Sequence, residues 1–233
     1  MPDYTLYYWS VPFRGQFVRA VLAWAGKEWR EAGDEEIGKL MKRPVEDMPV
    51  PFMGPPLLID HVNDFAIAEM PAIVLYLGET LERMPAAVPL RALMMKIVND
   101  ANDVIDELTL QGGQSMWTDA KWRAFVPRLE KWMSFWEETG RRHGLTEEAG
   151  FLLGGREPGI ADVVTATLWM TMAERFTEIA SIFDRAAPLT SSLARRVAAI
   201  PALASLAERA RHDYGDTYCG GQIEIALRKV ADR

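Results

Sequence analysis

The sequence is poor in cysteine and histidine. Its 233 residues include one cysteine, Cys219, and three histidines, at positions 61, 143 and 212. A single cysteine excludes an intramolecular disulfide and a CxxC redox pair, and it favours a reducing, cytoplasmic compartment. The histidines are scattered and show none of the spacings that metal ligands share. We therefore expect neither a bound metal nor disulfide chemistry within the chain.

Long apolar runs and an excess of basic residues are also lacking. No run approaches the roughly 20 apolar residues that a membrane span needs, and the opening MPDYTLYYWS lacks the basic-then-apolar layout of a signal peptide. Acidic residues outnumber basic ones, and the net charge is −7. Because phosphate binding requires a basic surface, this charge disfavours nucleic acid and anionic membrane as partners. We expect a cytoplasmic protein whose partners are neither.

The first eighty residues alternate between strand and helix patterns. Residues 4–9 (YTLYYW) are β-branched and aromatic, as is typical of a buried strand. Residues 16–25 carry apolar side chains at steps of three and four and are followed by Gly26, which predicts a helix and its end. We further expect a short strand near Trp29, strands at 57–59 and 65–67, and a helix over 68–78. The resulting order, β-α-β and then β-β-α, is that of a thioredoxin-like domain.

From about Leu81 onward the pattern is helical. Residues 81–88 are predicted to form a linker. Long helices are predicted at 90–110 and 119–142, and the second contains Pro127. Three more helices are expected at 159–175, 189–199 and 201–212, followed by an irregular tail with a short final helix. The predicted fold class is α+β, with a thioredoxin-like domain over residues 1–80 and an all-helical bundle over residues 89–233.

Several segments together resemble one family. The opening MPDYTLYYWSVPFRGQFVRAVLAWAGKEWRE aligns without a gap with the start of tyrosine-type glutathione transferases, particularly the pi-like group. GPPLLID and AEMPAIVLYL resemble the family's strand and helix around a cis-proline and an acid–serine pair, and GIADVVTATLW resembles the capping segment of its buried helix. The resemblance spans most of the N-terminal domain and one landmark of the second. It implies reduced glutathione as co-substrate, no tightly bound cofactor, and a homodimer.

By this resemblance, Tyr8 is the candidate catalytic residue. Its hydroxyl would donate a hydrogen bond to the sulfur of glutathione. A free thiol has a pKa of about 8.5 and is only a few per cent ionised at pH 7, so activation means stabilising the thiolate. Tyr8 could instead be a core aromatic residue like Tyr7. Ser10 is the alternative catalytic residue, because other branches of the superfamily use a serine near this place.

Other positions match the family's glutathione contacts. Arg14 could pair with a glutathione carboxylate through its planar guanidinium, or it could lie at the surface, whereas Arg19 is expected to form a buried structural pair. Asp103 could reach the amine of glutathione across a dimer interface. It belongs to an acidic helix face that we expect to be solvated rather than metal-binding, since no histidine accompanies it; the face comprises Asp100, Asp103, Asp106 and Glu107.

Two departures from the family pattern fall in the expected glutathione site. Pro56 matches the cis-proline, yet the residue before it, which normally offers an N–H and a C=O, is Pro55 and has no N–H. If Pro55 were the cis residue, Gly54 would supply the donor. Glu69 matches the acid that holds the γ-glutamyl end at a helix N-terminus. Its usual serine partner is replaced by Met70, which cannot donate a hydrogen bond.

The predicted function is the conjugation of reduced glutathione to an apolar electrophile. Trp9, Met116 and Trp117 are candidates to line the electrophile's pocket. The alternative is a non-catalytic binding module with a degenerate glutathione site, which Pro55 and Met70 favour. A glutaredoxin-like oxidoreductase is disfavoured because the loop after the first strand has no cysteine. In the helical domain, Gly159 and Asp162 are expected to cap a buried helix, a structural role.

Overall fold

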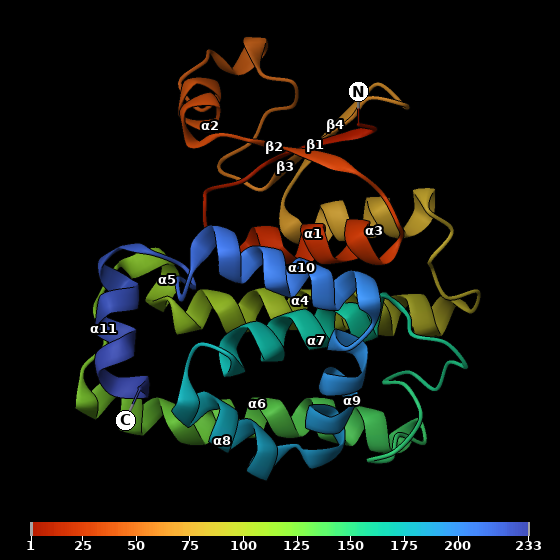
Figure 1. Ribbon diagram of the computed structural model, residues 1–233, viewed down its shortest axis with the longest axis vertical. Helices are drawn as coiled ribbons and strands as arrows, with labels where there is room; N and C mark the ends of the chain where they lie inside the picture. The colour runs from red at the N-terminus through yellow and green to blue at the C-terminus, as the bar shows by residue number, and fades with distance from the viewer. Residues whose placement is uncertain (1, 233) are drawn as a thin grey trace.

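A small mixed sheet forms the core of the N-terminal part. The computed structural model describes residues 2–232 (Figure 1). The sheet has the strand order β2-β1-β3-β4, with β1 parallel to β2 and antiparallel to β3, and with β3 antiparallel to β4. Its strands are β1 (Tyr4–Tyr7), β2 (Trp29–Ala32), β3 (Leu57–Asp60) and β4 (Phe65–Ala68).

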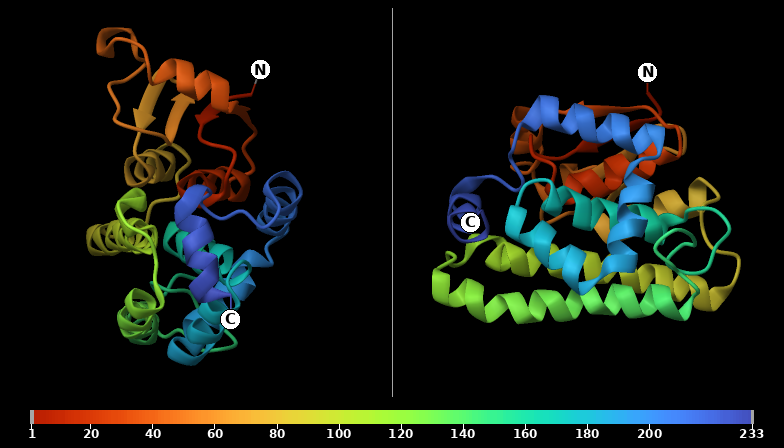
Figure 2. Two further views of the ribbon diagram at one scale, coloured as in Figure 1. Left: turned by 90° about the vertical axis from the view of Figure 1, so that its left-hand side faces the viewer. Right: turned by 60° about the horizontal axis from the view of Figure 1, so that its bottom comes forward.

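Three helices accompany the sheet. They are α1 (Phe13–Trp24), α2 (Asp34–Leu40) and α3 (Met70–Thr80), with a 3₁₀ turn, η1 (Val45–Asp47), after α2. Figures 1 and 2 show α1 and α3 between the sheet and the helical part of the chain, and α2 on the other side of the sheet. The predicted order, β-α-β followed by β-β-α, is confirmed.

The rest of the described chain is helical. Its helices are α4 (Val88–Leu108), α5 (Leu110–Gly113), α6 (Asp119–Arg142), α7 (Ile160–Ala173), α8 (Thr177–Ala186), α9 (Pro188–Ala198), α10 (Pro201–Tyr214) and α11 (Gly221–Ala231). The long helices and the final helix lie where the sequence predicts them. The sequence reading missed α5 and α8. Helix α8 buries only Ile179, Ile182 and Phe183, and α9 follows it after a single residue, so its pattern is short.

Asp162 holds the N-terminus of the buried helix α7, as predicted. Its carboxylate accepts hydrogen bonds from the backbone N–H of Gly159 at 2.8 Å and of Leu152 at 2.7 Å. Glycine at the cap has no side chain to offer, so the carboxylate three residues later satisfies the amide instead. The preceding loop is thereby fastened to the helix.

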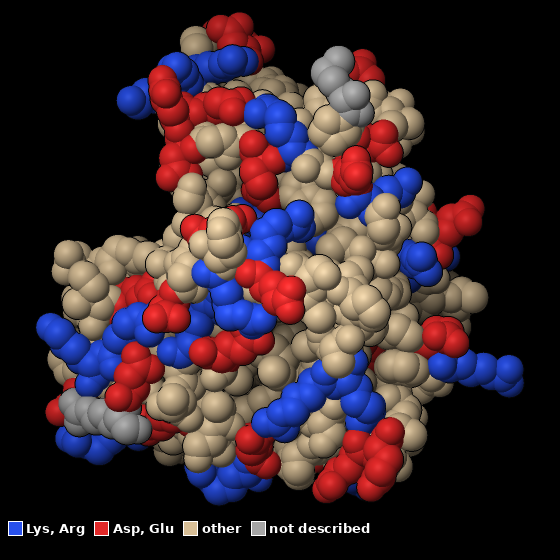
Figure 3. Space-filling view, in the orientation of Figure 1, with Lys and Arg blue, Asp and Glu red and all other residues tan. Residues whose placement is uncertain are grey.

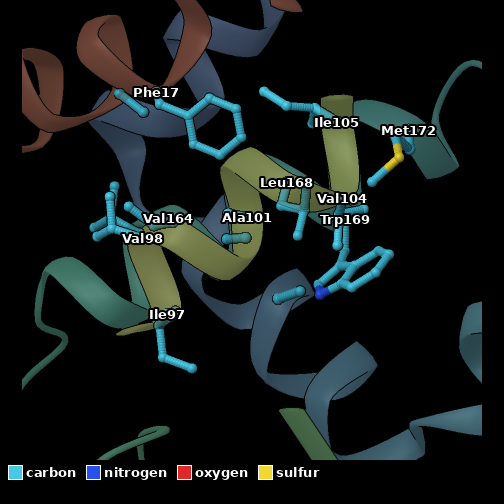
Figure 4. Packing of buried hydrophobic residues seen from close by; sticks show 14 of the residues in the cluster. Phe17, Ile97, Val98, Ala101, Val104, Ile105, Val164, Leu168, Trp169 and Met172 are labelled. Carbon is cyan, nitrogen blue, oxygen red and sulfur yellow. The ribbon is translucent and has the colours of Figure 1, made fainter. Parts of the chain in front are cut away.

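The junction between the two parts is a continuous apolar core. Figure 4 shows Phe17 of α1 directed toward α4 and α7, where Ala101 and Val104 of α4 lie beside Leu168 of α7. Helix α1, whose first turn contains Arg14, also packs against α10. This burial keeps α1 in a defined position, on which the site geometry depends.

The surface carries interspersed charges. On the face shown in Figure 3, blue and red side chains alternate, in keeping with ion pairs such as Arg211–Glu174 and Arg228–Glu224. Within residues 2–232, no helix combines the length and apolarity that crossing a membrane requires.

Candidate functional site

The sheet register brings several predicted residues to one edge. Tyr7 pairs with Leu57 in β3, and Leu57 pairs with Ala68 in β4. In antiparallel strands, the residue that follows one member of a pair lies next to the residue that precedes the other. Tyr8, Pro56 and Glu69 therefore meet at the same edge of the sheet.

Tyr8 is nearly buried, with 4% of its surface exposed. Its hydroxyl oxygen accepts a hydrogen bond from the backbone N–H of Arg14 at 3.0 Å, so the phenolic proton remains free to be donated. Burial raises the pKa of Tyr8 to about 12, although the nearby Arg14 and its amide act in the opposite direction. The group is therefore a neutral donor at physiological pH and not a base.

Gly15 sets the position of the Tyr8 ring. A Cβ at this position would lie 2.3 Å from Cδ1 and 2.6 Å from Cγ of Tyr8, closer than real contacts allow. Sequence reasoning missed this residue. A glycine in the first turn of a helix, where it lowers helix stability, was the available signal.

Arg19 fastens the loop between β1 and α1. Its side chain is 3% exposed and forms a bidentate pair with Glu31, at 2.8 and 3.0 Å. It also donates to the carbonyl oxygens of Val11 and Pro12. The predicted structural pair is confirmed for the buried Arg19, whereas its partner Glu31 is exposed; the pair stabilises the loop that follows Tyr8.

Ser10 lies outside the buried edge. It is exposed, and both its backbone N–H and its hydroxyl donate to Oδ1 of Asp34 at 3.0 Å. Asp34 is the first residue of α2. The hydroxyl proton of Ser10 is thus engaged by a carboxylate, whereas that of Tyr8 is available.

The guanidinium of Arg14 reaches across to α4. It donates to Asn102 at 3.3 Å and to Asp106 at 3.0 Å. Asp106 is therefore paired, which corrects the expectation that the whole acidic face of α4 is merely solvated. Asp103 is exposed and lines a groove of about 350 Å³ between α4 and α6. No bond joins it to the sheet edge in the described chain.

The peptide bond between Pro55 and Pro56 is cis, so Pro56 is the cis residue and the alternative that assigned this role to Pro55 is wrong. The Glu69 N–H donates to the Pro56 carbonyl at 3.1 Å. Glu69 has φ of +73° and an exposed side chain at the N-cap of α3. The Met70 side chain is fully buried, so only its backbone amide is available to a ligand.

A cavity of about 380 Å³ opens beside the N-terminus of α1. It is walled by the end of α4, by α5 and by the C-terminal tail. Met116 lines it as predicted, whereas Trp117 is buried with its indole N–H donated to the Leu108 carbonyl. Trp9 is exposed and does not line it. The lining residues are Phe13, Thr109, Gly112, Gly113, Met116, Cys219, Gly220, Gly221, Gln222 and Ile223.

Residues 2–232 contain no cluster of three or more His, Cys, Asp or Glu side chains arranged to hold a metal ion. The arrangement instead offers hydrogen-bond donors at the sheet edge and a mostly apolar cavity at the N-terminus of α1, the helix whose Arg14 amide bonds to Tyr8. Such a pairing can hold a polar molecule and a less polar one close together.

Comparison with known protein families identifies more than half of the chain. Residues 93–230 match the family model described as glutathione S-transferase, C-terminal domain. No curated protein matches the sequence significantly.

Solved structures share the fold. A monomeric glutathione S-transferase from the hookworm Necator americanus has 22% identity and a TM-score of 0.70. A Nu-class enzyme from Haemonchus contortus has 20% and 0.67, and a nematode-specific one from C. elegans has 20% and 0.70. Each alignment covers 89% of this chain and 97% of the other. These likenesses confirm a thioredoxin-like sheet followed by a helical domain.

Proposed function

Because the chain belongs to the glutathione S-transferase family, we propose that it conjugates reduced glutathione to an apolar electrophile. Glutathione is the co-substrate, and no tightly bound cofactor is needed. For an aryl halide, a C–S bond forms from the thiolate as the carbon–halogen bond breaks. The halide leaves with the bonding electron pair, and the thiol proton passes to solvent.

The observation that carries this proposal is the Tyr8 hydroxyl at the sheet edge. It accepts from the Arg14 amide and keeps its own proton, which it donates to the glutathione sulfur. Lowering the pKa of a thiol by two units requires about 2.7 kcal/mol of preferential thiolate stabilisation. A hydrogen bond to a charged group contributes roughly 1.5–3 kcal/mol. One phenolic donor is therefore of the right magnitude to activate the thiol.

Groups around Tyr8 can hold the rest of glutathione. The Pro55 carbonyl can accept a backbone N–H from the tripeptide. The first turn of α3, which begins at Met70, leaves amides without intrahelical partners, and these suit the γ-glutamyl carboxylate. Exposed Glu69 can accept from the γ-glutamyl amine, and Arg14 adds a cation near the same edge. The electrophile occupies the cavity lined by Phe13 and Met116.

We also propose a homodimer located in the cytosol. The family resemblance supports the dimer, in which Asp103 on the exposed face of α4 would reach the glutathione amine bound by the partner subunit. The Necator structure is described as monomeric, so this assembly varies among similar folds. Sedimentation of the protein at micromolar concentration tests the dimer, and an Asp103→Asn variant tests the shared contact by its glutathione affinity.

Two observations favour a second candidate, a binding module that has lost catalysis. Pro55 has no N–H to offer a peptide ligand. The Met70 side chain is withdrawn into the core, where a family serine would donate a hydrogen bond. Losing such a bond to a carboxylate weakens binding by roughly 1.5–3 kcal/mol. The intact Tyr8 environment nevertheless makes the transferase the better-supported function.

Calorimetry and turnover together test the proposal. We expect heat of association with reduced glutathione in the micromolar to millimolar range, and conjugation of chlorodinitrobenzene by the same preparation. Oxidised glutathione and the S-methyl derivative serve as controls, because neither presents a thiol. Binding without turnover, or neither binding nor turnover, would favour the module, and absence of binding at millimolar glutathione would overturn the transferase.

A further inference from the structure

The C-terminal tail supplies one wall of the cavity. Residues 219–223 line it together with Phe13, and helix α11, which begins at Gly221, packs against α5, α6 and α8. Figure 1 shows α11 standing beside α5 at the end of the helical domain, away from α9. The inner face of α11 is buried, and its apolar residues are Leu227, Val230 and Ala231. The wall therefore depends on how the segment before α11 is held.

One carboxylate holds that segment. Oε2 of Glu224 accepts hydrogen bonds from three consecutive backbone amides, those of Tyr218 at 3.0 Å, Cys219 at 2.9 Å and Gly220 at 2.6 Å. Its other oxygen accepts from Arg228 at 2.7 and 3.0 Å. Glu224 is 6% exposed, and removing it would leave one buried and two part-buried donors without their shared acceptor.

The charge on Glu224 is stabilised in place. Burial opposes ionisation, but the amide bonds and Arg228 outweigh it, and the pKa of the carboxyl lies below its usual value. The contact is therefore present throughout the neutral range and is lost only as the pH falls below the ordinary glutamate pKa.

The same segment also touches the loop that carries the proposed catalytic group. The Phe13 N–H donates to the Tyr218 carbonyl at 3.2 Å, and the two rings meet edge to face at 5.5 Å. The neighbouring Thr217 carbonyl accepts from Arg175 at 2.9 Å. Segment 217–220 thus joins the tail directly to the N-terminus of α1, beside the cavity.

The cavity has no formal charge along its walls. Among residues 2–232, no Lys, Arg, Asp or Glu side chain lines it. Burial raises the pKa of the Cys219 thiol to about 12, which keeps it protonated. An ion entering such a lining would lose hydration without gaining a counter-charge, so the walls favour an uncharged molecule.

We infer that Glu224 is a positioning residue for the second substrate: by fixing segment 218–220 it shapes the cavity wall and sets the affinity for an uncharged electrophile. The inference rests on the proposed transferase function for its substrate, but not for its geometry. Glu224 is not among the residues that line the cavity. Its loss therefore changes electrophile binding and leaves glutathione activation intact.

The test compares Glu224→Gln with the wild-type protein. We expect KM for chlorodinitrobenzene to rise at least fivefold, while KM for glutathione stays within about twofold of the wild-type value. The pKa of the bound thiol, measured by thiolate absorbance, should stay within about 0.3 units of the wild-type value. Wild-type turnover of chlorodinitrobenzoate, the carboxylate analogue, should be at least tenfold lower in kcat/KM than that of the neutral compound.

Matched variants separate positioning from general instability. Glu138→Gln removes a carboxylate on α6 that also accepts hydrogen bonds from arginine, in its case from Arg141 and Arg142; its kinetics should match wild type. Glu224→Asp keeps the charge and withdraws it from the amides. This variant should repeat the electrophile-specific loss if Glu224→Gln does not fold.

A binding measurement tests the role of Glu224 even if the protein does not catalyse conjugation. Binding of the neutral dye Nile red, displaced by chlorodinitrobenzene, should weaken at least fivefold in Glu224→Gln whether or not glutathione binds. If the wild-type protein shows no turnover but Glu224→Gln still weakens dye binding, the transferase proposal is overturned and the role of Glu224 stands. Unchanged dye affinity, or equal rises in both KM values, overturns the role of Glu224.

Discussion

The Tyr8 ring lies directly against the backbone of Gly15, and a single added carbon at Gly15 would stand 2.3 Å from Cδ1 of the ring. The next amide along the chain toward the N-terminus, that of Arg14, donates to the Tyr8 hydroxyl. The first turn of α1 thus fixes both the ring and the oxygen of the proposed thiol activator. The lack of a side chain at position 15 leaves the space that the Tyr8 ring occupies.

Replacing Gly15 with alanine should therefore displace Tyr8. We expect kcat for conjugation to fall roughly ten- to hundredfold, since a misplacement of about 1 Å can have this effect. The overpacking should also lower the free energy of unfolding by about 1–3 kcal/mol. Steady-state kinetics and thermal melting measure the two effects.

Gly38→Ala in α2 provides the control, because a Cβ there meets nothing within 4 Å. That variant should retain wild-type kcat and gain about 0.5–1 kcal/mol of stability, the usual benefit of alanine in a helix. A Gly15→Ala protein with wild-type kcat would show that the ring position does not matter for the reaction.

Removing the phenolic oxygen should change the pH dependence of the rate. In Tyr8→Phe, the bound thiol loses one donor worth roughly 1.5–3 kcal/mol. The rising limb of kcat/KM against pH should move upward by about one to two units, with a ten- to hundredfold lower rate at neutral pH. Wild type should show no falling limb from Tyr8 below about pH 12, the value to which burial raises its pKa.

Tyr7→Phe is the matched control for that experiment, since Tyr7 is the neighbouring residue in β1 and its hydroxyl does not bond to Arg14. Its profile should overlay that of wild type. If Tyr8→Phe retained the wild-type profile, Ser10 would become the candidate, although its hydroxyl now donates to Asp34.

Local patterning predicted most of the fold. The apolar spacing over 119–142 matches α6, and the aromatic run from Tyr4 matches β1. Such patterns report which side of an element is buried, so they identify long elements well. Helix α8 was missed because it is short, and only three of its residues, Ile179, Ile182 and Phe183, are buried.

The site was only partly predictable, for a physical reason. Tyr8, Pro56 and Glu69 could be proposed because their segments resemble a known family. The Arg14–Asp106 and Glu224–Tyr218 contacts depend instead on the three-dimensional approach of side chains and backbone. An arginine and an aspartate 92 positions apart carry no mark of their pairing in a single sequence. The role of Gly15 likewise emerges only once the ring of Tyr8 has a position.

The cap of α7 makes a separate prediction about stability. Asp162→Ala removes the acceptor for the amides of Gly159 and Leu152. Leaving these donors unsatisfied should cost about 3 kcal/mol, which for a chain of this size lowers the melting temperature by roughly 6–12 °C. Asp162→Asn should lose less because it keeps one acceptor oxygen. Exposed Asp213→Ala should melt within about 2 °C of wild type.

Arg14 offers a direct test of whether its guanidinium serves the ligand as well as the fold. Its ion pair with Asp106 is partly exposed, with side chains 21% and 45% accessible, so solvent screening limits that pair to about 1 kcal/mol or less. If the pair only stabilises the packing of α1 against α4, Arg14→Met and Asp106→Asn should weaken glutathione binding equally, by no more than about fivefold. A guanidinium that also meets a glutathione carboxylate contributes roughly 1.5–3 kcal/mol more.

We therefore expect Arg14→Met to raise the glutathione Kd at least tenfold and Asp106→Asn to raise it less than fivefold, both measured by calorimetry. The Arg14 backbone amide survives in either variant, so the bond to the Tyr8 hydroxyl persists and the thiol pKa should not move. The double variant should bind no more weakly than Arg14→Met alone, because the loss of Asp106 acts only through the guanidinium. Equal effects of the two single changes would assign Arg14 to the fold and leave the carboxylates of glutathione to backbone amides.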